Sequence, residues 1–126
     1  MLSLKGKVAF ITGAGSIGAG WGNGKATAVL LARQGAQVFG TDINPDAVET
    51  TRAIIAKEGG DCTTQLCDMT NSDSVKAAVD ACIKRYGRID ILINNVGGSA
   101  PGDPVSMSEE VWDSQIDHNL KTAFLG

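Results

Sequence analysis

Residues that build metal centres and disulfide frameworks are scarce in this sequence. Its 126 residues include one histidine and three cysteines. Cys62, Cys67 and Cys82 are odd in number and lack the spacing of metal ligands, and only His118 is available to join them. We therefore expect buried free thiols and no metal site.

Long apolar runs and an excess of positive charge are also lacking. No segment reaches the roughly 18 continuous apolar residues that a membrane span needs, and the first residues do not have the order of a signal peptide. The formal net charge is −3 and the pI is near 5.0, whereas nucleic-acid binders usually present a basic face. We expect a cytoplasmic protein that binds neither membranes nor nucleic acid.

Glycine, by contrast, is concentrated in one stretch. Residues 13–24 hold six of the chain's 16 glycines. The stretch follows an apolar run, 7–12, that predicts a buried parallel strand, and it precedes an amphipathic segment, 25–33, that predicts a helix. Glycine lets the backbone approach a ligand closely, and the start of a helix offers unpaired N–H groups to an anion. This order of elements predicts a nucleotide phosphate site.

The rest of the chain continues the alternation of strand and helix. Strands are predicted at 36–41, 63–66 and 89–93, the last as a central strand, and helices are predicted after Asn44-Pro45, after Asn71 or Ser72, and after Ser108. Alternation of this kind implies a parallel sheet with helices on both faces, because parallel strands need crossover connections. We predict an α/β fold in one domain, residues 1–126, with a doubly wound parallel Rossmann sheet of strand order 3-2-1-4. The ligand is then expected between the carboxyl ends of the first and fourth strands.

Two features of this predicted site bear on its ligand. Gly13, Gly15 and Gly18 fit the G-x-G-x-x-G fingerprint of dinucleotide-binding proteins, which is weak evidence alone. Asp42 ends the second strand, where in dinucleotide-binding folds an acid accepts hydrogen bonds from the adenosine ribose. The alternative is that Asp42 is an ordinary loop acid before a turn, with no role in binding. A carboxylate there would repel a 2′-phosphate, so NAD is favoured over NADP.

The register of the glycine stretch has two solutions, because Gly22 and Gly24 lie closer to the helix than Gly18 does. In the first, Gly18 is already helical and shares a face with Gly22. In the second, an insertion of several residues precedes a helix that starts near Asn23, with Trp21 on the tip of the insertion. Counting residues does not decide between them.

Taken together, the motifs resemble the short-chain dehydrogenase/reductase family. The family's TGxxxGxG pattern is approached by Thr12-Gly13 and then by Gly22-Asn23-Gly24, with about five extra residues between them. The other matches are Asp42 for the acid after the second strand, Asp68-Met69 after the third, Asn94-Asn95-Val96-Gly97 for NNAG, and Asn119 for the helix asparagine. The similarity runs from about residue 4 to residue 126.

This resemblance implies a role for each matched residue. The loop at Gly13 would hold the pyrophosphate, Asp42 the adenosine ribose, and Asp68 with Met69 the adenine, while Asn119 would be the active-site asparagine. The cofactor-binding residues expected on this basis are Thr12, Gly13, Gly15, Ser16, Gly18, Gly22, Asp42, Asp68, Met69, Asn94, Asn95 and Gly97.

The family's proton-transfer pair, Tyr-x-x-x-Lys, has no counterpart in these residues. The only tyrosine, Tyr86, is followed four residues on by Asp90, and a phenol with a pKa near 10 needs an adjacent cation to act as a base. We interpret the chain as the amino-terminal, coenzyme-binding half of an NAD(P)-dependent oxidoreductase acting on a small carbonyl or alcohol, inactive by itself. The alternative is a non-catalytic NAD-binding module; a methyl-donor-binding relative is disfavoured by the asparagine motifs.

Two further expectations concern surfaces. If the sheet ends at the fourth strand, the run 89–93 leaves an unpaired apolar edge, which favours a homo-oligomer formed there and along the last helix, with Trp112, Ile116, Leu120 and Phe124. His118 is expected on a helix surface rather than as a catalytic base.

Overall fold

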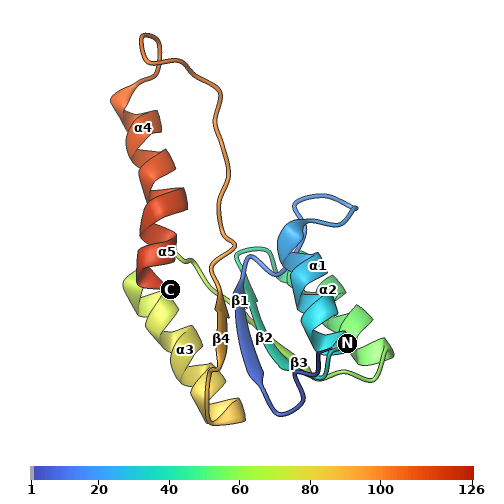
Figure 1. Cartoon of the computed structure of the whole chain (residues 1–126). Helices are drawn as coiled ribbons and strands as arrows, with labels where there is room; N and C mark the ends of the chain where they lie inside the picture. Colours follow the sequence, from blue (N-terminus) through green and yellow to red (C-terminus); the bar gives the residue numbers. More distant parts are fainter. Residues whose placement is uncertain (1) are drawn as a thin grey trace.

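Four parallel strands form the centre of the computed structural model, which describes residues 2–126 (Figure 1). They are β1 (Val8–Thr12), β2 (Gln37–Asp42), β3 (Cys62–Leu66) and β4 (Ile91–Ile93), in the order β3-β2-β1-β4. The predicted fold class and strand order are therefore confirmed.

Strand β4 differs from the expectation in two respects. It lies at the edge of the described sheet rather than in its centre, and Leu92 is 43% exposed. It also begins two residues later than expected. The reason is that Asp90 turns toward β1, where its carboxylate accepts the Val8 N–H at 2.9 Å and its own N–H donates to the Val8 carbonyl at 2.9 Å.

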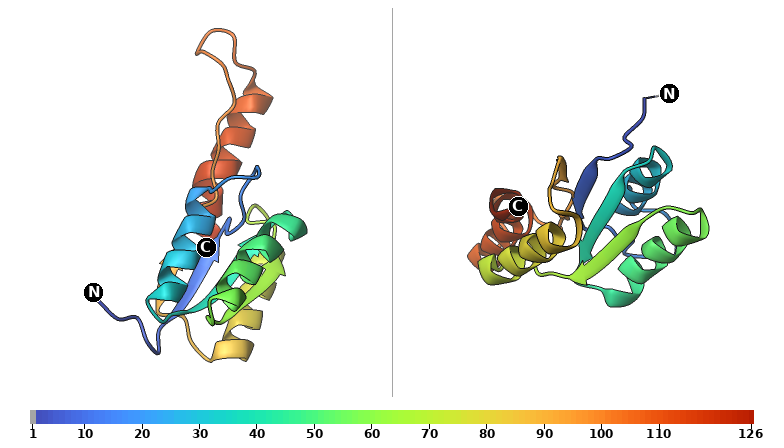
Figure 2. Two further views of the ribbon diagram at one scale, coloured as in Figure 1. Left: turned by 90° about the vertical axis from the view of Figure 1, so that its right-hand side faces the viewer. Right: turned by 90° about the horizontal axis from the view of Figure 1, so that it is seen from below.

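Helices cover both faces of the sheet (Figure 2). Helices α1 (Asn23–Arg33) and α2 (Pro45–Lys57) lie on one face. The other face carries α3 (Ser72–Tyr86) and the end of the last helix, which packs there through Leu125. This last helix runs as α4 (Glu109–Ile116), a π-helical turn η1 (Asp117–Lys121) and α5 (Thr122–Leu125). An extended segment between β4 and α4 rises with α4 above the carboxyl edge of the sheet.

The helix boundaries follow from local signals in the sequence. Asn44 caps α2 by accepting the N–H groups of Asp46 and Ala47, and of the two candidates for α3 it is Asn71 that caps, at 2.9 Å from the Ser74 N–H. Side-chain caps of this kind satisfy N–H groups that a helix cannot pair internally. Gly87 ends α3 in the left-handed conformation, with φ +83°, which glycine adopts without strain.

The core consists of two clusters, one on each face of the sheet. Ala9, Ile11 and Val38 pack against α1 and α2, whereas Phe10 and Phe39 pack against α3. The rings of Phe10 and Phe39 stack with centroids 5.4 Å apart. All five residues of β1 are buried, which holds the end of this strand rigidly beneath the glycine stretch.

Helix α1 starts at Asn23, so the second solution for the glycine register is confirmed. Gly18 is not helical, and residues 17–21 form an insertion between Ser16 and Gly22. The expectation that Trp21 lies on the tip of the insertion is wrong: Trp21 directly precedes the N-cap Gly22 of α1, with its ring 4.5 Å from the Lys25 ammonium, and is 58% exposed.

The three cysteines are free, as expected, although only Cys67 and Cys82 are fully buried. Burial raises the pKa of the Cys62 thiol to about 12 and that of Cys82 to about 11. Within residues 2–126 there is no cluster of His, Cys, Asp or Glu side chains that could hold a metal ion. Over the same range, every helix is too short or too polar to cross a membrane.

Candidate functional site

A cleft of about 430 Å³ opens at the carboxyl edge of the sheet, where the strand order places the switch point between β1 and β4. Its walls come from five parts of the chain: the glycine stretch 13–24, residues 42–43 at the end of β2, residues 67–70 after β3, residues 95–97 after β4, and the helical residues His118 and Thr122. In sheets of this kind, ligands bind at such a switch point.

The floor of the cleft is formed where the first turn of α1 lies against the backbone that follows β1, at unusually close range. A Cβ added at Gly24, in the first turn of α1, would overlap the Gly13 carbonyl oxygen, and one added at Gly13 would lie 2.9 Å from Asn95 Nδ2. Gly13 also has φ +64°. Asn95 fixes this arrangement by donating from Nδ2 to the Gly13 carbonyl at 3.0 Å. The glycines therefore let α1, β1 and the segment after β4 meet at one point.

Thr12 supports the floor from beneath. It is 1% exposed, and its hydroxyl oxygen accepts the N–H groups of Asn95 and Val96 at 3.0 and 3.3 Å. It does not line the cleft. Its position indicates that it aligns the ends of β1 and β4 rather than contacting a ligand.

The amino terminus of α1 is the part of the cleft best suited to an anion. Its N-cap is Gly22, which provides no side-chain cap, and no acid lies in the first turn. By contrast, α2, α3 and α4 are capped by Asn44, Asn71 and Ser108. Uncapped N–H groups at a helix start carry partial positive charge and hydrogen-bond phosphate oxygens well.

Asp42 lines the cleft at the end of β2 and holds the glycine stretch in place. Its carboxylate accepts the Gly15 N–H at 2.9 Å through Oδ2 and the Asn44 N–H at 3.0 Å through Oδ1. Each carboxylate oxygen can accept a second hydrogen bond, so the group keeps capacity for a ligand hydroxyl. A Cβ added at Gly15 would lie only 2.6 Å from Ala47 Cβ, which explains a glycine at that position.

The turn after β3 forms the next wall. The Asp68 carboxylate accepts the N–H and the hydroxyl of Thr70 at 2.9 and 2.6 Å, and these hydrogen bonds lower the pKa of Asp68 below its usual range. Met69, 3% exposed, adds an apolar surface beside it. A charged carboxylate and a buried thioether thus stand together near the Asp42 side of the cleft.

The asparagines after β4 divide into two groups. Asn95 and Gly97 line the cleft, but Asn94 lies outside it, with its side chain against Gly126. Asn119 also lies outside the lining: its Oδ1 accepts the Gly98 N–H at 3.0 Å, and its Nδ2 donates to the Gln115 carbonyl at 2.9 Å. Asn119 therefore ties the π-helical turn to the segment after β4.

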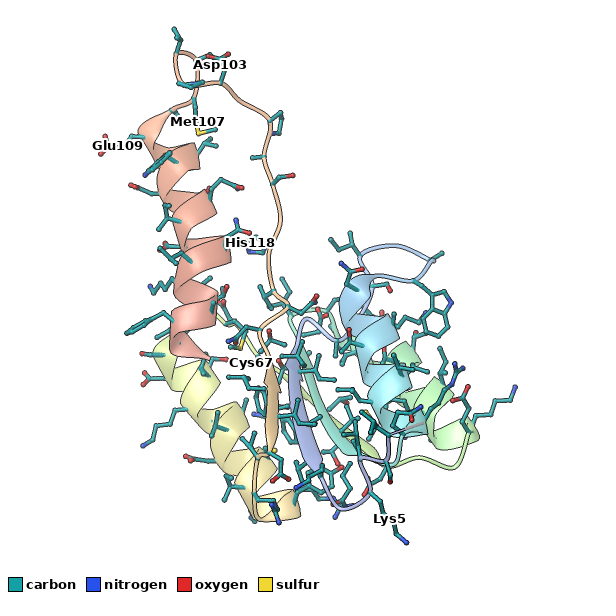
Figure 3. All side chains as sticks on the ribbon, in the orientation of Figure 1. Lys5, Cys67, Asp103, Met107, Glu109 and His118 are labelled. Carbon is teal, nitrogen blue, oxygen red and sulfur yellow. The ribbon has the colours of Figure 1, made fainter. Side chains whose placement is uncertain are left out.

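His118 departs from the expectation of a surface residue. It is half-buried, lines the cleft, and points from the helix toward the segment after β4 (Figure 3). Its Nε2 lies within 3.0 Å of a Cβ added at Gly98. The π-helical turn that contains it was not foreseen, although such turns often mark functional positions.

The structure also adds lining residues that the sequence interpretation missed, while leaving Gly18 in open space outside the cleft. Gly24 and Asn23 could have been found from the final Gly-x-Gly of the motif, and Ile43 from its place after Asp42. The other additional residues are Ile17, Cys67, Thr70, His118 and Thr122. These carry no motif and are brought to the cleft by the tertiary fold.

Comparison with known protein families and solved structures gives a consistent result. The family model described as short chain dehydrogenase matches residues 7–126. The 3-oxoacyl-(acyl-carrier-protein) reductase FabG of Thermotoga maritima is 37% identical over 123 residues, which are 98% of this chain and 48% of that protein.

Two solved structures illustrate the likeness in fold. A Burkholderia xenovorans protein assigned to the short-chain dehydrogenases/reductases is 48% identical, with a TM-score of 0.94 over 97% of this chain and 48% of its own. A metagenomic short-chain oxidoreductase in complex with NADP is 33% identical, with a TM-score of 0.87 over 97% of this chain and 53% of its own. The chain spans about half the length of the curated relatives it matches.

Proposed function

Because the chain belongs to the short-chain dehydrogenase/reductase family, we propose that its cleft binds NAD and serves hydride transfer to or from a small carbonyl or alcohol substrate. The observation that carries this proposal is the meeting of Asp42 and the uncapped amino terminus of α1 in one cleft. An acid for ribose hydroxyls and a helix start for phosphates are the two recognition elements that a dinucleotide requires.

The roles of individual residues follow from their places in the cleft. The backbone from Gly13 to Gly24 and the first turn of α1 bind the diphosphate, and Asp42 accepts the hydroxyls of the adenosine ribose. Asp68 and Met69 border the adenine, and Asn95 to Gly97 line the opposite end of the cleft. A bound nicotinamide supplies the chemistry by accepting or donating a hydride.

NAD is preferred over NADP in this proposal. The Asp42 carboxylate faces the cleft, and among residues 2–126 no lysine or arginine lines it. A 2′-phosphate next to Asp42 would bring like charges together without a neutralising cation, which costs several kcal/mol. NADH and NADPH affinities measured side by side test this preference.

Proton transfer is proposed to require residues other than those described. Tyr86 hydrogen-bonds to Thr63 and Asp61 at 2.9 Å each, and burial together with Asp61 raises its pKa to about 12. A phenol held in this way, far along α3 from the cleft, does not serve as a base near neutral pH. We expect these 126 residues alone to bind NAD without turnover.

The same observation supports a second candidate, a non-catalytic NAD-binding module. An assay for NADH production with a panel of alcohols, on a protein that includes sequence beyond Gly126, separates the two. Turnover that depends on a Tyr-x-x-x-Lys pair there supports the oxidoreductase, whereas NAD binding without turnover supports the module. Turnover by the 126 residues alone would contradict the proposal that a Tyr-x-x-x-Lys pair is required.

Self-association and a cytoplasmic location complete the proposal. Leu92 on β4 and Trp112, Leu120 and Phe124 on the last helix are between 43% and 84% exposed, and large apolar patches favour interfaces. Three free thiols fit a reducing compartment. Sedimentation as a clean monomer at high concentration would argue against association.

A further inference from the structure

The inserted loop, Ile17–Trp21, leaves and rejoins the phosphate-binding backbone at nearly one point. The Ser16 hydroxyl oxygen accepts the Gly22 N–H at 2.8 Å. A Cβ added at Gly22 would lie in van der Waals contact with Ser16, 3.5 Å from its Oγ and 3.7 Å from its Cα. The two ends of the loop are therefore in contact, and the five residues between them project away from Ser16 and Gly22.

One end of the inserted loop is anchored to α1. The Lys25 ammonium lies 4.5 Å from the centroid of the Trp21 ring and 3.4 Å from the Gly20 carbonyl oxygen. Lys25 is only 6% exposed, and none of the ion pairs within residues 2–126 includes it. A desolvated ammonium gains most from an aromatic face, so Lys25 is a positioning residue that fixes Trp21.

The other end of the inserted loop is free and borders the cleft. A Cβ added at Gly18 would meet no atom within 4 Å. Ile17 lines the cleft yet is fully exposed, at 104% of its reference area. The loop rises above the carboxyl edge of the sheet next to α1 (Figure 1). An aliphatic side chain left in water at the rim of a binding cleft gains free energy when a ligand covers it.

We propose that the inserted loop folds over the diphosphate of the bound dinucleotide, with Ile17 as the covering side chain and Trp21 on Lys25 as the fixed end. The inference rests on the proposed binding of NAD. Covering the diphosphate excludes water from its hydrogen bonds to the α1 N–H groups, and such bonds are stronger where the local dielectric is low. The loop then acts mainly by slowing dissociation.

Fluorescence of Trp21 reports the loop directly once Trp112, the only other tryptophan, is replaced. In a Trp112→Phe background, we would measure NADH affinity and dissociation rate for Ile17→Ser from Trp21 fluorescence. Deletion of residues 17–21 removes Trp21, so for that variant, and for the parent beside it, the fluorescence of bound NADH is measured instead. Val105→Ser is the matched control, because Val105 is 96% exposed on the segment before α4 and does not line the cleft. Lys25→Met keeps an aliphatic stem but removes the ammonium beneath Trp21.

The expected results are specific to the loop. Ile17→Ser weakens NADH binding about three- to tenfold, as expected for loss of partial burial of an aliphatic side chain, and the change appears as faster dissociation. The deletion weakens NADH binding about tenfold or more, again by the loss of buried apolar contact. Lys25→Met reduces the change in Trp21 fluorescence when NADH binds. Val105→Ser leaves NADH affinity and dissociation rate unchanged.

Two other outcomes would overturn the inference. Only the second would also reject the proposed binding of NAD. If the parent chain binds NADH and both Ile17→Ser and the deletion bind equally well, the loop does not cover the ligand and the proposed function stands. If the folded parent chain does not bind NADH, the proposed function fails as well.

Discussion

Asp42 Oδ2 accepts the N–H of Gly15 at 2.9 Å, so the acid that ends β2 also fixes the middle of the glycine stretch. The two features that the sequence presents separately are thus one unit in the structure. The Asp42 carboxylate sets the conformation of the backbone that would bind phosphate, and it also presents negative charge to the cleft. A change at Asp42 is therefore expected to affect both ligand choice and loop order.

The first prediction separates these two effects. Asp42→Asn keeps an oxygen that can accept the Gly15 N–H but removes the negative charge, so the ratio of NADPH to NADH affinity should rise at least about tenfold as repulsion of the 2′-phosphate is lost. Fluorescence titration with both cofactors measures the ratio. Asp46→Asn, which removes an exposed acid from the first turn of α2, serves as the control, and an equal shift in both variants would show a general charge effect.

The second prediction concerns the close contact of α1 with β1. Gly24→Ala places a Cβ onto the Gly13 carbonyl oxygen, and the strand and helix must separate to admit it. We expect the free energy of unfolding to fall by about 1–3 kcal/mol, the usual cost of overpacking. Gly18→Ala should leave urea denaturation unchanged, because its Cβ would stand in open space. Equal stability of the two variants would mean that the contact at Gly24 is looser than described.

The third prediction tests the link between Asn119 and Gly98. Asn119→Ala removes the acceptor of the Gly98 N–H, so hydrogen exchange at that amide should accelerate about fivefold or more, the equivalent of one hydrogen bond. Ser114→Ala on the same helix loses only a bond to the Val111 carbonyl and should leave Gly98 unchanged. If neither variant alters exchange, Asn119 does not hold the segment after β4.

The fourth prediction is a pH dependence that comes from the buried thiols. Burial raises the pKa values of Cys62 and Cys82 to about 12 and 11, whereas unfolded thiols ionise near 8.5. The native state therefore holds these protons more tightly, and the free energy of unfolding should fall as pH rises from about 8.5 toward 11. Urea denaturation across this range measures the slope, which should diminish in Cys82→Ala. A thiol reagent at pH 8 should label the native protein slowly and the urea-unfolded protein quickly.

Much of the fold could be predicted because its signals are local. Asn44 and Ser108 precede apolar stretches of helical spacing, and each caps the expected helix. The apolar run at β1 and the acid at Asp42 likewise lie where parallel alternation places them. Each of these depends on a few neighbouring residues, so the sequence alone determines it.

The features that escaped prediction depend on contacts between distant residues. Asn94 and Asn95 are adjacent and chemically identical, yet only Asn95 bonds to Gly13, because the distant Thr12 hydroxyl accepts its N–H and holds it beside the end of β1. The π-helical turn that directs His118 to the cleft has no sequence signature. The register of the inserted loop depends on the hydrogen bond between Ser16 and Gly22, which joins its two ends and which residue counting does not reveal.

NAD binding by the cleft is tested most directly by calorimetric titration of the purified 126-residue chain with NAD⁺, NADP⁺ and a methyl donor of the S-adenosyl type in parallel. We predict saturable 1:1 binding of NAD⁺, weaker binding of NADP⁺ and no heat from the methyl donor. A chain that is folded by circular dichroism but gives no heat with NAD⁺, or that binds only the methyl donor, would contradict it.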